Sequence, residues 1–170
     1  MNIRHLVIDV DGTLTDSGIY YDNNGNELKK FSTRDGAAII VARAADIKII
    51  ILTGRESHAV LRRMTELKVD IIQQNIQNKR AWLSEYMSKN CIPKDEIGFI
   101  GDDLIDLEAM KLCGFVASPV DACKEVKAIS TYISSLKGGE GAVRDCIEFL
   151  LSTTGEWERC VKIAFGAKSS

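Results

Sequence analysis

Aspartates that follow two apolar runs are the residues of this sequence best suited to chemistry. Asp9 and Asp11 follow the run LVI, Asp102 and Asp103 follow the run IGFI, and Asp106 lies three residues further on. Two aspartates at alternate positions of a strand point to the same face, where their charges repel unless a cation lies between them. Mg²⁺ binds such carboxylates together with carbonyl, water and phosphate oxygens. We therefore predict an Mg²⁺ site here; the alternative is that these aspartates only cap helices and turns.

A threonine and a lysine between the two acidic clusters have the chemistry of phosphate ligands. Thr53 ends the apolar run IIIL, so its hydroxyl and the amide of Gly54 can donate to phosphoryl oxygens. Lys79 offers a positive charge to a phosphoryl group and to the carboxylate of a nucleophile. The chain order D-x-D, Thr, Lys, D-D therefore predicts a site for phosphoryl transfer.

Short apolar runs alternate with amphipathic stretches along the chain. This alternation predicts an α/β fold, a three-layer Rossmann-like parallel sheet with helices on both faces. Ligands of such sheets bind at the carboxyl ends of the strands, so the residues named above are expected at one rim. The expected strands lie within 5–10, 47–52, 69–72, 97–100 and 114–117, and the expected helices near 34–45, 56–67, 77–89, 104–112, 122–128 and 141–151.

One segment breaks this alternation. The segment from about residue 17 to residue 32 contains two extended stretches around Asn23-Asn24-Gly25-Asn26. An Asn-Gly turn between β-prone flanks predicts a hairpin. We expect a β-hairpin flap after the first strand, within a single domain of residues 1–151. With 170 residues in all, no room for an inserted cap domain is expected. Residues 152–170 are expected to form a C-terminal tail.

Composition narrows the classes of function. The net charge of -2 argues against a nucleic-acid-binding protein, which would show a basic excess. No apolar run approaches the roughly 20 residues that cross a bilayer, so no membrane partner is expected. The five cysteines are odd in number and none form C-x-x-C, and no signal peptide is expected at the start. A cytoplasmic protein is the simplest reading.

The motifs resemble those of the haloacid dehalogenase superfamily, in which phosphate passes through an aspartyl-phosphate. DVDGTLTD resembles its motif I, ILTG motif II, Lys79 motif III and IGDDLID motif IV. The stretches YYDNNGNELKKFSTRDG, QNIQNK and KGGEGAVRD resemble the capless branch of that superfamily. Members of this branch hydrolyse phosphates of 2-keto-3-deoxy sugar acids, and one member is a domain fused to CMP-sialate synthetases.

The resemblance implies a role for each residue of the predicted site. Asp9 would be the nucleophile, and Asp11 would protonate the leaving sugar oxygen and then activate water. The Asp9 carboxylate, the Asp11 backbone carbonyl and Asp102 would bind Mg²⁺. Asp103 and Asp106 would orient waters and Lys79 rather than bind the metal.

Substrate choice is less well marked than the chemistry. A basic residue should meet the carboxylate of a sugar acid, and Arg55 is placed to do so. Arg63 aligns with an arginine that relatives present across a subunit interface, and a surface salt bridge is the equal alternative. The expected substrate is 3-deoxy-D-manno-octulosonate 8-phosphate (KDO 8-phosphate), which the Arg55 pattern favours. A nine-carbon ulosonate 9-phosphate (sialic acid-like or KDN) is the alternative, which Glu140 in the turn Gly138–Gly141 favours.

The resemblance also implies assembly and leaves other classes open. Family members without a cap form homotetramers through their flap hairpins, and the apolar residues Ile19, Tyr20, Tyr21, Leu28 and Phe31 are compatible with that. A hairpin that folds back on its own domain is the alternative. In relatives the tail can reach a neighbouring active site; packing on its own subunit or disorder are the alternatives here. A non-catalytic assembly domain is the alternative of another class. A receiver domain would place its acids and lysine in a different chain order, and a sugar phosphomutase would need a cap.

Overall fold

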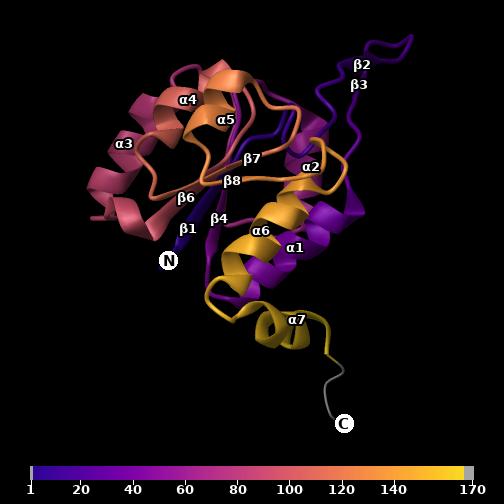
Figure 1. The fold of residues 1–170 in the computed structure, drawn as a ribbon. Coiled ribbons are helices and arrows are strands. Elements are labelled where there is room, and N and C mark those ends of the chain that lie inside the picture. Colours follow the sequence, from indigo (N-terminus) through magenta and orange to yellow (C-terminus); the bar gives the residue numbers. More distant parts are fainter. Residues whose placement is uncertain (1, 167–170) are drawn as a thin grey trace.

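A six-stranded parallel sheet between two layers of helices forms the centre of the protein (Figure 1), as seen in a computed structural model that describes residues 2–166. The strand order is β5-β4-β1-β6-β7-β8, so β1 lies between β4 and β6. This confirms the predicted fold class. The strands of the sheet are β1 (His5–Ile8), β4 (Lys48–Leu52), β5 (Ile71–Gln73), β6 (Ile97–Ile100), β7 (Phe115–Ser118) and β8 (Tyr132–Ile133).

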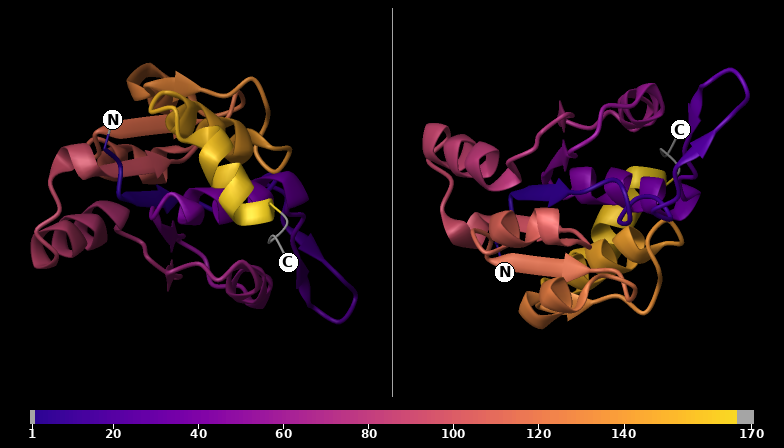
Figure 2. Two further views of the ribbon diagram at one scale, coloured as in Figure 1. Left: turned by 90° about the horizontal axis from the view of Figure 1, so that it is seen from below. Right: turned by 90° about the horizontal axis from the view of Figure 1, so that it is seen from above.

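The helices divide between the two faces of the sheet. Helices α1, α2, α6 and α7 pack on one face, and α3, α4 and α5 pack on the other (Figures 1 and 2). The helices are α1 (Thr33–Ala44), α2 (His58–Glu66), α3 (Lys79–Lys89), α4 (Leu104–Met110), α5 (Lys124–Ile129), α6 (Ala142–Ser152) and α7 (Trp157–Phe165), with a short 3-10 helix at Lys94–Glu96.

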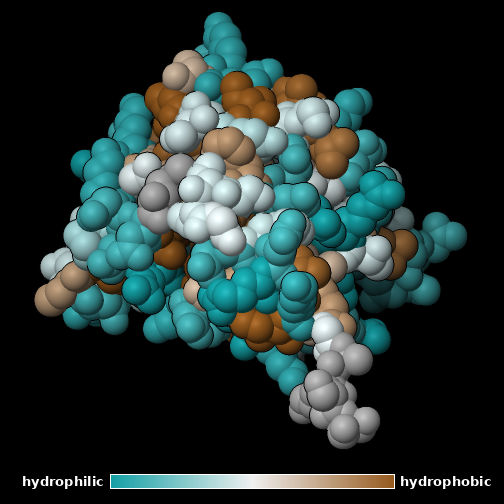
Figure 3. Space-filling model, turned by 60° about the horizontal axis from the view of Figure 1, so that its bottom comes forward, coloured by the Kyte–Doolittle hydropathy of each residue, from teal (hydrophilic) through white to brown (hydrophobic). Residues whose placement is uncertain are grey.

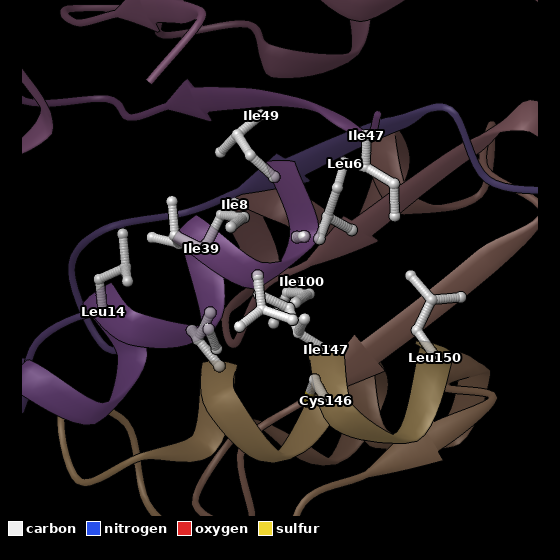
Figure 4. Packing of buried hydrophobic residues seen from close by; sticks show 14 of the residues in the cluster. Leu6, Ile8, Leu14, Ile39, Ile47, Ile49, Ile100, Cys146, Ile147 and Leu150 are labelled. Atoms are coloured by element: carbon white, nitrogen blue, oxygen red, sulfur yellow. The ribbon is translucent and has the colours of Figure 1, made fainter. Parts of the chain in front are cut away.

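Successive residues of each buried strand supply the two cores in turn. Leu6 and Ile8 of β1 face the α1 and α6 layer, where they meet Ile39 and Ile147 (Figure 4), whereas Val7 faces the opposite layer. This alternation follows from the two-residue period of a strand. Because both faces are covered, the central strands β1, β4, β6 and β7 consist mostly of buried apolar residues, as is typical of parallel sheets.

Two details of the sheet differ from the expectation. The first strand ends at Ile8, so Asp9 and Asp11 lie in the following turn and not at alternate positions of a strand. The sixth strand, β8, was not predicted from the sequence. It has only two residues, too few to show a strand period, and it pairs with β7 through Ala117 and Ser118.

The segment that follows the first strand forms a hairpin. Strands β2 (Tyr20–Tyr21) and β3 (Glu27–Leu28) are antiparallel, with Tyr20 opposite Leu28. Asp22 organises the turn between them, since its side chain accepts hydrogen bonds from the backbone amides of Asn24 and Asn26. Both views in Figure 2 show the hairpin projecting from the body of the protein.

The C-terminal region contains a helix that packs against the rest of the same chain. Helix α7 lies against α1, and Cys160 is buried in the core that they share. Trp157 stacks under the guanidinium of Arg144, whose Cζ lies 4.9 Å from the ring centroid. Within the part of the tail that the structure describes, packing on the same chain is therefore the alternative observed. Residues 167–170 lie outside the described residues.

On the face seen in Figure 3, hydrophobic residues form small separate groups among hydrophilic ones. Among residues 2–166, no helix combines the length and the apolar character that spanning a bilayer requires.

Candidate active site

The ends of three neighbouring strands bring the predicted residues together. Asp9 follows β1, Thr53 follows β4 and Asp102 lies two residues after β6. Ile8 at the end of β1 is in register with Ile51 of β4 and Ile100 of β6, so the three strands end at nearly the same level. The predicted rim at the carboxyl edge of the sheet is therefore present.

The turn after β1 is tight because one carbonyl accepts several amides. The Val10 oxygen accepts from the backbone amides of Thr13, Leu14 and Thr15 at 3.0–3.3 Å. Gly12 has a φ of +97°, and a Cβ there would lie only 2.0 Å from Oδ2 of Asp102. Glycine is needed at this position both for the backbone conformation and for the close approach of the Asp102 carboxylate.

A buried lysine joins the two acidic clusters. Nζ of Lys79 lies 2.5 Å from Oδ1 of Asp9 and 2.6 Å from Oδ1 of Asp106. The lysine is the first residue of α3, which Asn78 caps by accepting from the amide of Ala81 at 2.9 Å. Its side chain is only 1% exposed, so the ion pairs form out of contact with water.

Asp106 and Asp103 have different partners. Oδ2 of Asp106 accepts from the backbone amide of Asp102 at 3.1 Å, while its other oxygen contacts Lys79. Asp103 is the N-cap of α4 and accepts from the amide of Leu104 at 2.8 Å. Asp106 therefore contacts Lys79, whereas Asp103 has the helix-capping position that was its alternative.

The cluster around Lys79 carries more negative than positive charge. Asp9, Asp102 and Asp106 each have one carboxylate oxygen within 4.8 Å of those of the other two, and Lys79 pairs with Asp9 and Asp106. Burial and the charge of Asp106 raise the pKa of Asp9 well above its ordinary value and that of Asp102 to about 7. Burial lowers the pKa of Lys79, but the charges of Asp9 and Asp106 outweigh this effect and raise it.

Three carboxylates against one ammonium leave an excess of two negative charges when all are ionised. A divalent cation bound by oxygen ligands would balance this excess. Oδ1 of Asp102 accepts from the hydroxyl of Thr13 at 2.9 Å, which leaves its other oxygen for a further partner. The donor set therefore fits Mg²⁺, which prefers carboxylate oxygens.

Asp11 lies beside this cluster and contacts the base of the hairpin. Its Oδ1 forms an ion pair with Nζ of Lys29, and its Oδ2 lies 3.9 Å from Nε of Arg55. Arg55 also donates to Oε1 of Glu27 at 2.8 Å. Asp9 and Asp11 thus face different cations, Lys79 and Lys29, rather than sharing one face of a strand.

Thr53 and Gly54 lie in the turn after β4. Thr53 is buried, its backbone oxygen accepts from the amide of Ile76 at 3.0 Å, and its hydroxyl oxygen lies 3.4 Å from the amide of Arg55. The backbone oxygen of Gly54 accepts from the side chain of Gln77 at 2.8 Å. The Thr53 hydroxyl and the Gly54 amide are the two groups that the sequence predicts as donors to phosphoryl oxygens.

Two residues considered for specificity lie apart from the acidic cluster. Arg63 of α2 pairs with Glu66 at 3.4 Å, which is the surface salt bridge that was its alternative. Glu140 is exposed in the glycine turn before α6. Sequence reasoning missed Glu27 and Lys29 as neighbours of the site. The alternation of these two residues in ELKK is the signal that could have found them.

Comparisons with known proteins agree with this geometry. Residues 6–77 match the family model of haloacid dehalogenase-like hydrolases. The chain is 38% identical over 155 residues to the 3-deoxy-D-manno-octulosonate 8-phosphate phosphatase of Escherichia coli K12, covering 91% of this chain and 82% of that protein.

Solved structures show the same similarity. The phosphatase of this name from Moraxella catarrhalis, in complex with magnesium ion, phosphate ion and KDO, superposes with a TM-score of 0.90 at 34% identity, covering 95% of this chain and 93% of that one. The cobalt-bound form from Haemophilus influenzae superposes with a TM-score of 0.85 at 34% identity, covering 91% of each chain.

Proposed function

The chain belongs to the haloacid dehalogenase-like hydrolases, in the family of the 3-deoxy-D-manno-octulosonate 8-phosphate phosphatases, and we propose that it is an Mg²⁺-dependent phosphatase of that sugar acid phosphate. The observation that carries this proposal is the buried contact between Asp9 and Lys79 at the carboxyl edge of the sheet. This contact supports the proposal because the fixed ammonium group of Lys79 reduces the repulsion between the Asp9 carboxylate and an anionic phosphate.

The reaction proceeds by two displacements at phosphorus. A carboxylate oxygen of Asp9 attacks phosphorus, the bond to the sugar oxygen breaks, and an aspartyl-phosphate forms. Asp11 gives its proton to the leaving sugar oxygen. Asp11 then takes a proton from a water molecule that attacks the same phosphorus, which releases phosphate and restores the Asp9 carboxylate.

The remaining residues of the site bind and orient. The Thr53 hydroxyl and the Gly54 amide donate to phosphoryl oxygens, and Lys79 holds Asp9 and a phosphoryl oxygen. The Asp9 carboxylate, the Asp102 carboxylate and the backbone oxygen of Asp11 would hold Mg²⁺, which when bound reduces the repulsion between carboxylate and phosphate. Asp106 positions Lys79, because both of its oxygens already have partners.

Arginines supply the recognition of the sugar acid in this proposal. Arg55 lies between Glu27 and Asp11, at the rim where the leaving group would lie, so its guanidinium is placed to meet a carboxylate. Arg63 would have to exchange its salt bridge with Glu66 to reach the site of a neighbouring subunit, and we propose that it does so in the assembly.

Assembly completes the site. We propose a homotetramer formed through the flap hairpins of residues 17–32, in place of a cap domain, because Ile19, Tyr20, Tyr21 and Leu28 are 47–62% exposed on a small projecting hairpin. A cytoplasmic location goes with this proposal, since Cys113, Cys146 and Cys160 are buried free thiols.

Sedimentation of Leu28→Lys tests the assembly, with Ile163→Lys on the exposed face of α7 as the matched control. A lower mass for Leu28→Lys alone is expected, and an unchanged mass would overturn the flap interface.

Hydrolysis of p-nitrophenyl phosphate with and without Mg²⁺ tests the class of function. Asp9→Asn should abolish Mg²⁺-dependent phosphate release, whereas Asp95→Asn, at an exposed position of the 3-10 helix, should leave it unchanged. Equal and negligible release by wild type and Asp9→Asn would instead favour a non-catalytic assembly domain.

A panel of sugar phosphates ranked by kcat/KM tests the substrate. KDO 8-phosphate should be hydrolysed best. A higher value for a nine-carbon ulosonate 9-phosphate would overturn the substrate assignment and leave the phosphatase chemistry intact.

A further inference from the structure

The second strand of the flap hairpin and the two residues after it present alternate side chains to the active site and to solvent. Glu27 and Lys29 contact residues of the site, whereas Leu28 and Lys30 between and after them are exposed. This follows from the two-residue period of an extended chain. The hairpin therefore contributes side chains to the site of its own subunit as well as an apolar surface.

Lys29 is the more deeply placed of these two residues. Its side chain is only 1% exposed, which is unusual for a lysine on a projecting hairpin. Its ammonium group contacts Oδ1 of Asp11 and lies 3.4 Å from Oε1 of Glu27. A buried ammonium of this kind is stable only because both carboxylates are within reach.

The contact distinguishes the two oxygens of Asp11. Oδ1 is occupied by Lys29, whereas Oδ2 lies 3.9 Å from Nε of Arg55, beyond a hydrogen bond. A proton carried by the Asp11 carboxyl group is therefore directed to Oδ2. Without Lys29 the carboxyl group could rotate and carry its proton on either oxygen.

We propose that Lys29 is a positioning residue for the acid–base group Asp11, fixing its Oδ2 as the oxygen that exchanges protons with the leaving group and with water. This inference rests on the proposed phosphatase function. In the first step Oδ2 loses its proton to the sugar oxygen as the phosphorus–oxygen bond breaks and the bond to Asp9 forms. Glu27 supports this role because it holds both Lys29 and Arg55 at the base of the hairpin.

Two esters with different leaving groups test the proposal. A sugar alkoxide needs a proton as it leaves, whereas p-nitrophenolate does not, and kcat/KM reports the step in which the leaving group departs. Lys29→Met should lower kcat/KM for KDO 8-phosphate about tenfold or more, and that for p-nitrophenyl phosphate by less than about threefold. Lys29→Arg, which can still donate to Oδ1, should recover part of the loss.

Matched variants separate positioning from other roles. Lys30→Met, at the exposed neighbouring position, should leave both esters within about twofold of wild type. In the background of Asp11→Asn, Lys29→Met should cause no further loss, because two residues acting through one group are not additive. Lys29→Gln replaces Lys29→Met if thermal unfolding shows that the methionine variant does not fold.

Three results would overturn the proposal. Equal losses for the two esters would indicate a general structural role. A rise in KM at constant kcat would make Lys29 a residue that binds the substrate. Full additivity with Asp11→Asn would separate Lys29 from Asp11. Failure of the proposed function is distinct, since wild type would then hydrolyse neither ester and this proposal would fall with it.

Discussion

Nζ of Lys79, the first residue of α3, lies 2.5 Å from Oδ1 of Asp9, the first residue after β1. Seventy residues separate the two in the chain, and both side chains are buried at the carboxyl edge of the sheet. The pair is linked to α4 through Asp106, which contacts the same ammonium group. One lysine therefore ties together the two halves of the acidic site.

The hydrogen bonds of Asp106 and Asp103 predict that their asparagine variants differ in stability. Asp106→Asn should destabilise the protein by about 1–3 kcal/mol and reduce activity. The NH2 group of the asparagine would have to face either Lys79 or the backbone amide of Asp102, and both of these are donors. Asp103→Asn is the matched control, since asparagine caps a helix about as well as aspartate. Urea unfolding measures both, and equal stabilities would contradict the assigned partners.

Binding of Mg²⁺ should depend on pH. In the metal-free protein burial raises the pKa of Asp102 to about 7, so below that pH a proton competes with the metal for the carboxylate. The Mg²⁺ concentration needed to raise the Tm should therefore be higher at pH 6 than at pH 8. Removing the metal with EDTA should lower the Tm at pH 8. An affinity independent of pH over this range would contradict the raised pKa.

Gly12 and Gly155 both have a positive φ, but only one is close to the acidic site. A Cβ at Gly12 would lie 2.0 Å from Oδ2 of Asp102, whereas a Cβ at Gly155 would meet nothing within 4 Å. Gly155→Ala should cost about 1 kcal/mol of stability through backbone strain alone. Gly12→Ala should cost more and should also weaken Mg²⁺ binding, because Asp102 must move. Thermal unfolding with and without Mg²⁺ distinguishes the two, and an unchanged Mg²⁺ affinity in Gly12→Ala would contradict the contact.

Asp35 should make stability fall as the pH rises. This buried residue of α1 accepts from the backbone amide of Arg144 at 2.8 Å, and burial raises its pKa from 3.8 to about 6. Between these two values the folded protein holds the proton more tightly than the unfolded chain does. Stability is therefore lost through this window, by about 2–3 kcal/mol at most, and the loss is complete above about pH 6.

Asp35→Asn keeps the acceptor for Arg144 but cannot ionise, so its free energy of unfolding should not show this fall. Urea unfolding at several pH values between 4 and 7, compared with wild type, measures the difference. Asp95→Asn, at an exposed position, serves as the control. Parallel pH profiles for wild type and Asp35→Asn would show that Asp35 does not titrate as proposed.

Much of the site could be predicted because its residues follow buried strands. The apolar runs before Asp9, Thr53 and Asp102 are strong strand signals, and parallel strands bring their carboxyl ends to one edge. The order of these residues around Lys79 was sufficient for the family resemblance. The hairpin was predicted for a similar reason, since an Asn-Gly turn between extended flanks is a local signal.

The partners of individual side chains depended on tertiary packing. The predicted helix start near residue 104 places Asp103 at the N-cap, but only the approach of α3 to α4 decides that Asp106 is buried against Lys79. Strand β8 is too short to show a period and forms because β7 offers it an edge. Helix α7 is amphipathic, but its docking on α1 depends on where α6 ends, because a short turn connects the two helices.

Lys29 and Lys30 show the same division in a single dipeptide. The sequence determines that two lysines end the hairpin, and it determines that they point to opposite sides. Only the pairing of Tyr20 with Leu28 and the contacts of the hairpin base with Asp11 and Arg55 decide that Lys29 faces the protein while Lys30 faces solvent. The physical reason is that an extended chain fixes alternation locally, whereas the face turned toward the protein is set by contacts between segments distant in sequence.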